Sequence, residues 1–433
     1  MALANPIMKK ARFSQIPASQ IRDKRWGVRV DFNGITSARL QAAVKTTAKI
    51  IGNGGTAVLF SHNGRPNKID RSEWQGLSLF DAAAAFNLRL IEAKVVPEGV
   101  NAVRFVPETI GSAVRKAASQ LSPETPVLLT ENTRFYKMET AEKADVVMAF
   151  AEQMIGDAAI DHVVTNGFSA MHRSHASVTG IARAVRKKGG IAALGLEAEN
   201  EITFIWNYLI AKPHRPFIGL LGGAKVSGKD GKLKFLQALL PGMDAAVIGG
   251  AMLYPFLLLK YGKYAGKDPL AEIRETGELD ADIAAARQVL DTYGDKLILP
   301  TTLFDPARTG AIDIKKEQET DFVMRGIEEA HLMEKLAALS ERFNGIGTAV
   351  VNGTFSKTPE ITEGTYAAYA FINSLTKRGA LTVAGGGDTG KAIKQARKDG
   401  LEVEVGYTPT GGGAMLAVLS NRNLPGIEAL SDA

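Results

Sequence analysis

The sequence predicts an α/β protein made of two doubly wound parallel-sheet domains joined by a long helix. Short apolar runs alternate with longer amphipathic stretches from one end of the chain to the other. Apolar strands that alternate with helices are typical of parallel sheets covered on both faces. The chain has 433 residues, the length of two or three domains. Its 45% apolar and 23% charged residues exclude a disordered or fibrous protein.

The strands are predicted from the apolar runs, taken in chain order. Those of the first half are residues 27–32, 56–62, 103–106, 127–130 and 162–165. Those of the second half are residues 217–221, 245–248, 296–299, 348–351, 381–384 and 403–405. Stretches with the helical period, such as residues 37–51, 141–155 and 391–399, predict the helices between them.

The domain boundary is predicted from a long helical pattern at residues 193–211. Pro213 and Pro216 follow it, and proline ends a helix because it lacks the backbone N–H and clashes with the preceding turn. We therefore expect a first domain of residues 1–192, a connecting helix of residues 193–212 and a second domain of residues 213–414.

Composition and charge exclude several classes of function. The chain has no cysteine, which removes disulfides and thiolate chemistry and fits a reducing, cytoplasmic environment. The net charge is +6, but the basic residues are dispersed, so no nucleic-acid partner is expected. The longest apolar run, residues 245–259, is shorter than the about 18 residues that span a membrane. The basic segment 1–26 is a weak match to a transit peptide, and we interpret it as a surface strap.

Glycines gather directly after four strands of the second half. They are Gly222-Gly223, Gly249-Gly250, Gly385-Gly386-Gly387 and Gly411-Gly412-Gly413. Glycines at the carboxyl ends of parallel strands let backbone N–H groups approach an anion at a helix N-terminus. A single loop of this kind is usually a tight turn, but four in one domain predict a ligand that carries phosphate.

Two of these loops match short motifs by letter. Residues 385–390 fit G-x-G-x-x-G, with Glu402 and Glu404 downstream, as in a dinucleotide site. The same loop carries Asp388 and Thr389, and a carboxylate beside phosphate-binding amides is what magnesium–nucleotide binding requires. Residues 223–229 fit G-x-x-x-x-G-K, but the next residue is an aspartate instead of the Ser or Thr of a P-loop.

Polar residues with a different chemistry follow the strands of the first half. They are Asp31, Asn33 and Arg39 after the first strand, His62 and Arg65 after the second, Arg134 after the fourth, and His172, Arg173 and His175 after the fifth. The carboxyl ends of parallel strands meet at one edge of the sheet, where such folds bind ligands. Arginine holds carboxylates and phosphates with paired N–H groups. The cluster therefore predicts a small anionic substrate, and the two histidines lack a third ligand for a metal site.

These residues lie within ten segments that resemble the phosphoglycerate kinase family and occur in the family's order. The segments are RVDFN (29–33), ITSARL (35–40), SHNGRP (61–66), LLTENTRF (128–135), HRSHAS (172–177), LGGAKVSGK (221–229), VIGGAM (247–252), VVNG (350–353), GGGDT (385–389) and TGGGA (410–414). The resemblance extends over residues 13–430. One segment alone would mean little, whereas ten in order are specific.

The resemblance implies the two-domain fold, with residues 415–433 packing back on the first domain. It implies a monomeric, cytoplasmic, glycolytic enzyme that binds ATP or ADP with magnesium. The enzyme would transfer a phosphoryl group between the nucleotide and the carboxylate of 3-phosphoglycerate.

The resemblance also implies the site residues. Those for substrate are Asp31, Asn33, Arg39, His62, Arg65, Arg134 and Arg173. Those for nucleotide are Gly222, Gly223, Lys225, Lys229, Gly249, Gly250, Asn352, Glu360, Gly387, Asp388 and Thr389. Arg39, Lys225 and Lys229 would be catalytic, and Asp388 would ligate magnesium.

The departures from the family pattern are concentrated on the nucleotide side. Val351 replaces a tryptophan, and residues 353–360 replace G-P-M-G-V-F-E, so that Glu360 matches the ribose-binding glutamate only with one inserted residue. The G-P-K-[ST] helix start, expected near residues 330–335, is absent. Gly228 replaces the aspartate of G-G-A-K-V-S-D-K, and on the substrate side residues 165–168 replace N-D-A-F.

The expected reaction is in-line attack by a substrate carboxylate oxygen on the terminal phosphate, without a covalent enzyme intermediate. Arg39 and Lys225 would neutralise the transferring group, and the connecting helix would act as a hinge that brings the two sites together. Three alternatives stay open: a kinase for another phospho- or phosphonocarboxylate or with another donor, a non-catalytic binding protein that lost normal nucleotide use, and a dinucleotide oxidoreductase.

Overall fold

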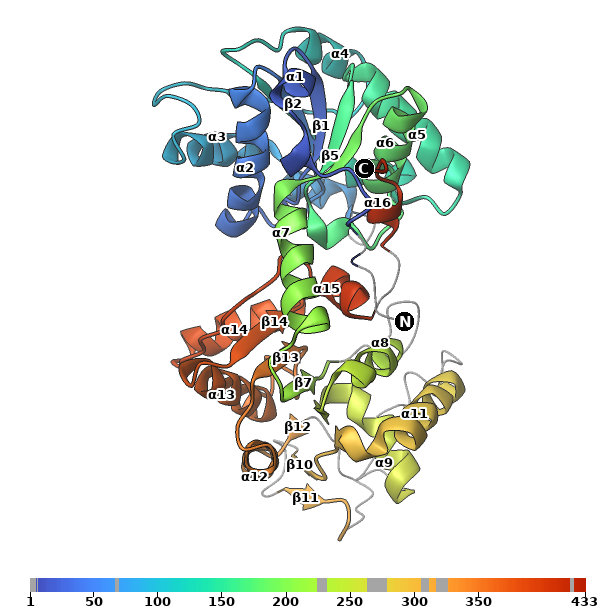
Figure 1. Cartoon of the computed structure of the whole chain (residues 1–433), viewed down its shortest axis with the longest axis vertical. Coiled ribbons are helices and arrows are strands. Elements are labelled where there is room, and N and C mark those ends of the chain that lie inside the picture. The colour runs from blue at the N-terminus through green and yellow to red at the C-terminus, as the bar shows by residue number, and fades with distance from the viewer. Residues whose placement is uncertain are drawn as a thin grey trace. The chain divides into compact units, whose positions relative to one another are not determined.

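The structure is a computed structural model that describes residues 5, 7–66, 70–223, 232–262, 279–304, 311–316, 326–420 and 424–433. The chain divides into two compact units, Met1–Phe204 with Arg422–Ala433, and Ile205–Asn421. Each unit contains a parallel sheet with helices packed against it (Figure 1). The predicted α/β class with parallel sheets is therefore confirmed.

The regular elements are as follows. In the first unit they are α1 (Ala18–Ile21), β1 (Arg25–Arg29), α2 (Ser37–Gly52), β2 (Thr56–Phe60), α3 (Phe80–Glu92), β3 (Val103–Val106), α4 (Ser112–Ser119), β4 (Val127–Thr130), α5 (Ala144–Asp157), β5 (His162–Thr165), α6 (Ile181–Lys187), β6 (Ala192–Leu194) and α16 (Pro425–Glu428). Helix α7 (Leu196–Ile205) ends at the start of the second unit. The second unit contains β7 (Phe217–Leu221), α8 (Lys232–Leu239), β8 (Ala245–Ile248), α9 (Leu253–Tyr261), α11 (Leu279–Tyr293), β9 (Leu297–Ile298), β10 (Thr302–Phe304), β11 (Ile312–Asp313), β12 (Gly326–Ile327), α12 (Glu329–Arg342), β13 (Thr348–Asn352), α13 (Glu363–Lys377), β14 (Leu381–Gly385), α14 (Gly387–Lys398) and α15 (Gly412–Leu419).

The first unit is built on a six-stranded sheet in the order β3-β4-β2-β1-β5-β6, with every neighbouring pair parallel. Successive side chains of a strand point to opposite faces, and the two cores of this unit divide accordingly. Ala57 and Leu59 of β2 belong to the core that also contains Leu40 of α2. Val58 and Phe60 belong to the other core, with α5 and α6. Figure 1 shows α2 and α3 on one side of this sheet and α5 and α6 on the other.

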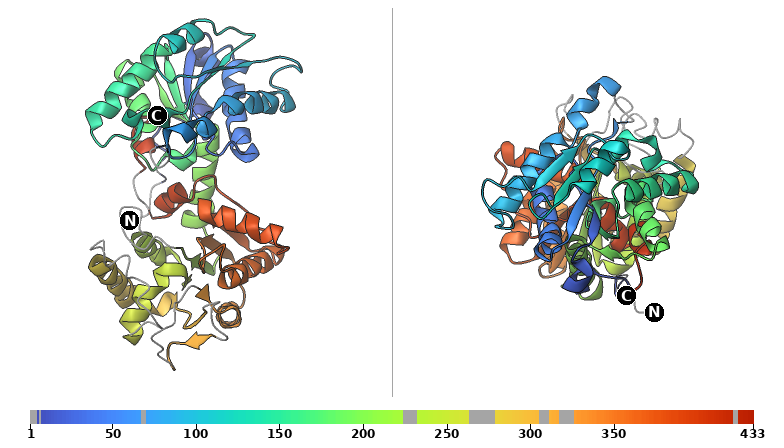
Figure 2. Two further views of the ribbon diagram at one scale, coloured as in Figure 1. Left: turned by 180° about the vertical axis from the view of Figure 1, so that it is seen from behind. Right: turned by 90° about the horizontal axis from the view of Figure 1, so that it is seen from above.

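The C-terminal residues 424–433 lie on the first unit, where Figure 2 shows the C-terminus. The amide of Gly426 donates to the carbonyl of Met171 (2.9 Å), and the amide of Ser431 donates to the carbonyl of Ala192 in β6 (2.8 Å). The carbonyl of Ser431 in turn accepts from the amide of Ala11 (2.9 Å). The last residues of the chain therefore fasten an N-terminal segment to the edge of the sheet.

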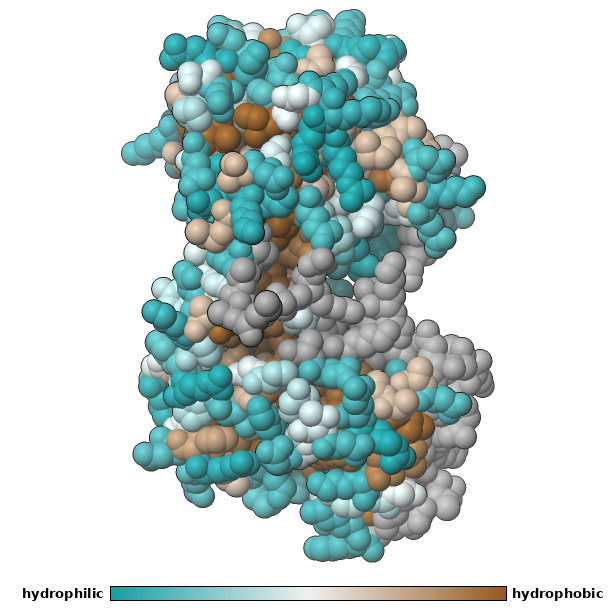
Figure 3. Space-filling model, turned by 45° about the vertical axis from the view of Figure 1, so that its right-hand side comes forward, coloured by the Kyte–Doolittle hydropathy of each residue, from teal (hydrophilic) through white to brown (hydrophobic). Residues whose placement is uncertain are grey.

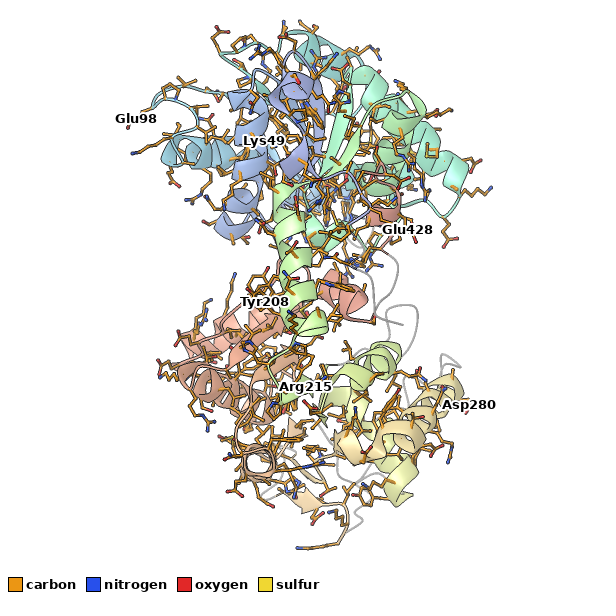
Figure 4. The ribbon with its side chains drawn as sticks, viewed as in Figure 1. Lys49, Glu98, Tyr208, Arg215, Asp280 and Glu428 are labelled. Carbon is orange, nitrogen blue, oxygen red and sulfur yellow. The ribbon has the colours of Figure 1, made fainter. Side chains whose placement is uncertain are left out.

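Lys49 of α2 fastens the same N-terminal region from another direction (Figure 4). Its ammonium group donates to the carbonyls of Phe13 (2.6 Å) and Ser14 (3.0 Å) and lies 5.0 Å from the centre of the Phe13 ring. Burial lowers the pKa of Lys49. Three contacts from one side chain thus fix the segment that the sequence analysis interprets as a surface strap.

The connecting helix begins later than the sequence predicts. Residues 192–194 form strand β6 beside β5, and α7 starts at Leu196. Gly195 lies between the two elements. A side chain at this position would overlap the backbone and side chain of Asn166, which explains why the residue is glycine. A π-helical turn, Trp206–Ala211, ends the helical stretch just before Pro213. Ala193 and Leu194 are therefore strand residues, although the helical periodicity of the sequence predicts a helix there.

The second unit is built on a five-stranded parallel sheet in the order β14-β13-β7-β8-β9. The strands predicted at 217–221 and 245–248 are confirmed, since β7 and β8 have the same bounds. A smaller antiparallel sheet, β11-β10-β12, adds short strands that the sequence analysis did not predict. Strands of two or three residues are too short to show an alternating pattern. Arg215 stands just before β7 (Figure 4) and pairs with Asp244 at 2.7 Å.

The strand predicted at residues 403–405 is wrong. This segment has no regular structure, because side chains bind its backbone groups in place of a neighbouring strand. Nε and Nη2 of Arg397 donate to the carbonyl of Val403 (2.9 and 2.6 Å). The amide of Glu404 donates to Asn373 Oδ1 (2.9 Å), and its carbonyl accepts from the hydroxyl of Thr376 (3.0 Å).

The described surface is mostly hydrophilic in the view of Figure 3, with small groups of hydrophobic residues between the polar ones. Two large apolar side chains on α3 are well exposed, Phe80 at 66% and Leu88 at 58%. Among the helices that the structure describes, none is both long enough and apolar enough to cross a membrane.

Candidate functional site

The polar residues that the sequence analysis singled out in the first half come together at the carboxyl edge of the six-stranded sheet. They lie in the loops and first helical turns that follow β1, β2, β4 and β5; they are Asp31, Asn33, Arg39, His62, Arg65, Arg134 and Arg173. Parallel strands deliver their carboxyl ends to the same edge, which is why residues more than 100 positions apart meet here.

Asp31 organises the loop after β1. Its Oδ1 accepts hydrogen bonds from Arg39 Nη1 (2.9 Å) and from the amide of Asn33 (3.1 Å), and its Oδ2 accepts from the hydroxyl of Ser169. Arg39 also donates to the carbonyl of Asn33 (2.8 Å). Asp31 is 7% exposed, and a buried carboxylate requires partners of this kind. The pair holds Arg39 in place while its side chain stays 24% exposed.

The loop after β2 is fastened to the loops after β1 and β4. The amide of Gly64 donates to Asn33 Oδ1 (2.8 Å), and Arg134 Nη1 donates to the carbonyl of Gly64 (2.7 Å). Asn132 contributes a further bond from Nδ2 to the carbonyl of Asn63 (2.7 Å). Arg65, which follows Gly64, is exposed. The three loops thus form one framework that presents the exposed side chain of Arg65 at the edge.

A buried group of side chains lies directly beneath this framework, and the sequence analysis did not predict it as part of the site. Arg29, at the end of β1, is 0% exposed, and its Nη2 lies 2.8 Å from His62 Nδ1. Its Nε lies 2.9 Å from the hydroxyl oxygen of Ser177, which lies 2.5 Å from Oε1 of the fully buried Glu139. An arginine inside an otherwise apolar strand signals a buried partner, but nothing in the sequence indicates that Glu139 and Ser177 supply it.

The electrostatics of this edge are strongly positive. Burial, together with Arg29, lowers the pKa of Arg134 to about 10, and Arg65 and Arg173 add to the effect while Glu139 opposes it. Burial lowers the pKa of His175 to about 3, with contributions from Arg134, Arg29 and Arg173. Basic groups that lower one another's pKa are stabilised by an added anion, since its charge favours their protonated forms. The edge is therefore suited to a small polyanion.

In the second unit, the predicted glycines also lie at the carboxyl edge of the sheet. Gly222 and Gly223 follow β7, Gly249 and Gly250 follow β8, and Gly387 opens α14 after β14. Asn352 is the last residue of β13, in the middle of the same edge.

The glycines after β7 and β8 allow close packing of the loops. The amides of Gly222, Gly249 and Gly250 donate to the carbonyls of Asn352 (2.9 Å), Leu221 (2.9 Å) and Phe355 (3.2 Å). A side chain at Gly249 would overlap the ring of Phe355, and one at Gly222 would overlap the carbonyl of Thr354. These three amides serve the protein itself, which corrects the expectation that they point at an anion.

The first turn of α14 is arranged differently. The hydroxyl of Thr389 donates to the carbonyl of Gly385 and accepts from the amide of Gly353, both at 2.8 Å, while Asn352 Nδ2 donates to the carbonyl of Gly385 (2.6 Å). Gly386 has φ 112°, a left-handed conformation that favours glycine. The first amides of a helix have no acceptor within the helix, so Gly387 and Asp388 stand where an anion can bind.

The residues of this turn fit a magnesium ion that arrives with its nucleotide. The Thr389 hydroxyl donates to one backbone group and accepts from another, so the carboxylate of Asp388 is the residue of this turn that would hold the ion. Magnesium in nucleotide sites usually takes one or two carboxylates and completes its shell with phosphate oxygens and water. Among the residues that the structure describes, no three His, Cys, Asp or Glu side chains gather into a metal site.

The departures from the family pattern have structural counterparts on this side. Glu328 closes the N-terminus of α12: its Oε1 accepts from the amide of Ala330 (3.1 Å) and its Oε2 from that of His331 (2.6 Å). An acidic cap thus occupies the helix start where the family has G-P-K-[ST]. Glu360 lies exposed, 3.9 Å from Lys357. Lys225, Gly228 and Lys229 lie outside the described residues.

Taken together, the chain is a doubly wound α/β protein in which one unit carries a basic edge and the other a glycine-rich edge. The family model "Phosphoglycerate kinase" matches residues 16–422. The chain therefore belongs to the phosphoglycerate kinase family, as the ten sequence segments predict.

Similar proteins agree with this assignment. The chain is 33% identical to a phosphoglycerate kinase of Lactobacillus delbrueckii subsp. bulgaricus, over 95% of this chain and 97% of that protein. It is 34% identical to one of Azorhizobium caulinodans, over 96% and 99%. The structure of phosphoglycerate kinase from Pyrococcus horikoshii OT3 matches with a TM-score of 0.74 at 24% identity, over 97% of this chain and 98% of that one. The one from Coxiella burnetii matches with a TM-score of 0.65.

Proposed function

We propose that this protein is a phosphoglycerate kinase, which transfers a phosphoryl group reversibly between ATP and the carboxylate of 3-phosphoglycerate. The observation that carries the proposal is the basic edge of the first unit in a member of this family. Three arginines there, Arg65, Arg134 and Arg173, interact electrostatically with one another, and Arg39 is anchored by Asp31. A phosphate and a carboxylate on one small molecule are the anions that such a cluster holds best.

On the substrate side, each residue has a role that follows from its chemistry. Arg65, Arg134 and Arg173 bind the phosphate and carboxylate oxygens, because guanidinium groups form paired bonds to both. His62 donates a hydrogen bond, and Asn33 braces the loop that carries Arg65. Asp31 orients Arg39, which neutralises negative charge on the transferring phosphoryl group.

On the nucleotide side, the first turn of α14 holds phosphate oxygens through the amides near Gly387. Magnesium, when bound at Asp388, would neutralise charge on the nucleotide phosphates. Lys225 and Lys229 contact the phosphates by resemblance to the family, and the closely packed Gly222, Gly223, Gly249 and Gly250 shape the wall of the pocket with Asn352, while Glu360 takes the ribose. The chemistry is a direct displacement, since a carboxylate oxygen is itself the nucleophile.

The two binding edges belong to different units, so the reaction requires them to approach each other. Helix α7 and the π-helical turn that follows it are the connecting segment and therefore the hinge. We further propose that the protein works as a cytoplasmic, glycolytic monomer without nucleic-acid or membrane partners, in keeping with its dispersed charge and its lack of cysteine.

A second candidate is a family member with another acceptor, another phosphoryl donor or no normal nucleotide use. The acidic cap at α12 favours it, because Glu328 occupies amides that would otherwise be open to a phosphate. The intact first turn of α14 favours retention of nucleotide binding. A dinucleotide oxidoreductase finds no support in the family match.

The test is a coupled turnover assay with ATP, magnesium and 3-phosphoglycerate on the full chain and its Lys225→Ala variant. We expect turnover by the wild type and a loss of at least about a hundredfold in kcat for the variant. A matched control is Lys187→Ala, which removes an exposed lysine paired with Glu152 and should leave kcat unchanged.

The outcomes separate the candidates. No turnover by folded wild-type protein would contradict the proposal. Turnover only with a different acceptor or donor, in a panel of phosphocarboxylates and nucleotides, would support the second candidate.

A further inference from the structure

A buried series of hydrogen bonds links Glu139 to His62 through Ser177 and Arg29. Arg29, in the middle of the series, determines which atoms donate and which accept. Arginine has N–H donors and no acceptor, so Arg29 donates to both of its side-chain partners. Its Nε lies 2.9 Å from the hydroxyl oxygen of Ser177, and its Nη2 lies 2.8 Å from His62 Nδ1. Both of those atoms are therefore acceptors.

Glu139 determines where the Ser177 hydroxyl hydrogen goes. Oε1 of Glu139 lies 2.5 Å from Ser177 Oγ, and Oε2 accepts from the amide of Ser177 (2.9 Å). Since Ser177 Oγ already accepts from Arg29, its own hydrogen is donated to the carboxylate. Glu139 and Arg29 are both 0% exposed, and a buried guanidinium needs a nearby anion because water does not reach it. Burial raises the pKa of Glu139, whereas Arg29 and the two hydrogen bonds from Ser177 oppose that rise. Glu139 is thus the acidic partner of Arg29 and, through Ser177, fixes the plane of the guanidinium.

The acceptor role of Nδ1 fixes the protonation of His62. A neutral imidazole carries one hydrogen, so the hydrogen is on Nε2. Burial lowers the pKa of His62 well below the ordinary value, and the positive or neutral groups Arg29, Arg134, His175 and Arg39 add to the effect. Within the described part of the chain, no protein acceptor is bonded to Nε2.

We propose that Glu139, Ser177 and Arg29 are positioning residues that hold His62 as a neutral Nε2–H donor for an oxygen of the anionic substrate. A donor of this kind keeps one hydrogen at one atom through the range of about pH 6 to 8. It also prevents the imidazole from accepting a hydrogen bond at the substrate side. The identity of the substrate rests on the proposed function, whereas the tautomer of His62 does not.

The first test reads the tautomer directly in the wild-type protein. Long-range proton–nitrogen NMR spectra of the full chain, labelled with nitrogen-15 in histidine, distinguish a protonated ring nitrogen from a bare one. His62→Gln assigns the signal. His162 serves as an internal control, because its Nδ1 accepts from the amide of Ile191 (3.0 Å) at a site outside this chain of contacts.

We expect His62 to show a bare Nδ1 and a protonated Nε2 from about pH 6 to 8, with or without 3-phosphoglycerate. A protonated Nδ1, or an imidazolium spectrum near neutral pH, would overturn the proposal. This measurement needs no substitution of Glu139, Ser177 or Arg29, and it needs no enzymatic activity. Absence of turnover would bear on the proposed function alone.

The second test interrupts the series of hydrogen bonds at two residues that do not bond to His62 directly. Ser177→Ala and Glu139→Gln should both give a population of His62 with the hydrogen on Nδ1, with the His162 signal unchanged. We expect KM for 3-phosphoglycerate to rise about tenfold and KM for ATP to stay the same. A folded Ser177→Ala protein with an unchanged His62 spectrum would contradict the positioning role, as would an equal rise of both KM values. If neither variant folds, the wild-type spectrum decides.

Discussion

The two sheet edges hold their ligand-facing groups in different ways. At the edge of the first unit, charged side chains are paired with one another, as in Asp31 with Arg39 and Glu139 with Arg29 through Ser177. At the edge of the second unit, backbone amides and carbonyls of glycine-rich loops bond to each other, and the ring of Phe355 lies against them. A charged network tolerates little change, because removal of one member leaves another buried and unpaired. A packed backbone edge tolerates new side chains wherever the loops still fit.

This contrast explains where the chain departs from its family. Apart from residues 165–168, the motifs of the charged edge match the family pattern, whereas the segment 353–360 and the start of α12 do not.

Arg39→Ala should have the largest effect. It removes the guanidinium that faces the substrate edge and leaves Asp31 without its countercharge. We expect kcat/KM with 3-phosphoglycerate to fall at least about a hundredfold, while KM for ATP changes little. Arg89→Ala, which removes an exposed arginine paired with Glu92, is the control in the same steady-state assay. Similar activity of the two variants would remove Arg39 from the site.

Phe355→Ala tests the packed edge. Its ring is 1% exposed and lies against Gly249. We expect a loss of about 3 kcal/mol in the free energy of unfolding, because the substitution leaves a cavity, and a higher KM for ATP with an unchanged KM for 3-phosphoglycerate. Chemical denaturation and steady-state kinetics measure the two effects. Phe80→Ala removes a ring that is 66% exposed and should change neither. A stable Phe355→Ala protein would show that the loops do not depend on this ring.

The pH dependence of stability tests the charged edge. Burial lowers the pKa of His175 to about 3, with contributions from Arg134, Arg29, Arg173 and His172, while Glu139 lies 3.9 Å from its Nδ1. The unfolded chain, with a histidine pKa near 6.5, binds more protons than the folded protein below that pH. Stability is therefore lost as the pH falls from about 6.5 toward 3.

His175→Gln isolates this contribution. Between about pH 7 and 5, the free energy of unfolding of the variant should fall by about 1–2 kcal/mol less than that of the wild type. Equilibrium denaturation at the two pH values measures the difference. Parallel curves for the two proteins would mean that His175 titrates normally.

Glu328→Ala should have the smallest effect. It opens the N-terminus of α12 by removing both hydrogen bonds of the cap, and we expect a loss of about 1 kcal/mol in stability. Glu329→Ala, at the next residue, is the control because Glu329 does not cap the helix. A rise in affinity for ATP in the Glu328 variant would show that the cap blocks a phosphate, whereas unchanged affinity would confine the role of Glu328 to stability.

Particular residues show how far the sequence could predict the fold and the site. Strands such as β3 and β4 were predicted to the residue, because short apolar runs between turns have few other interpretations. Residues 193–194 and 403–405 were wrongly assigned, because their partners decide their structure: β5 pairs with the first segment, and Arg397, Asn373 and Thr376 bind the second.

The site divides in the same way. Asp31, Arg39 and Arg134 could be placed at one edge because each follows a predicted strand. The roles of Glu139 and Ser177 could not, because both act through Arg29, and the family-like segment 172–177 that ends in Ser177 does not show which residue its hydroxyl contacts. The sequence also could not predict that the amides of Gly222, Gly249 and Gly250 donate to carbonyls of the protein itself. A glycine at a strand end is equally compatible with ligand binding and with close packing of loops.

Calorimetric titration of 3-phosphoglycerate into the full chain and its Arg134→Ala variant tests most directly whether the basic edge of the first unit is the substrate site. We expect the wild type to bind 3-phosphoglycerate and the variant to bind it at least about tenfold more weakly, because a charge-assisted bond is lost. Both proteins should bind ATP with magnesium equally well. Equal affinity of the two proteins for 3-phosphoglycerate, or no binding by folded wild type, would contradict this assignment.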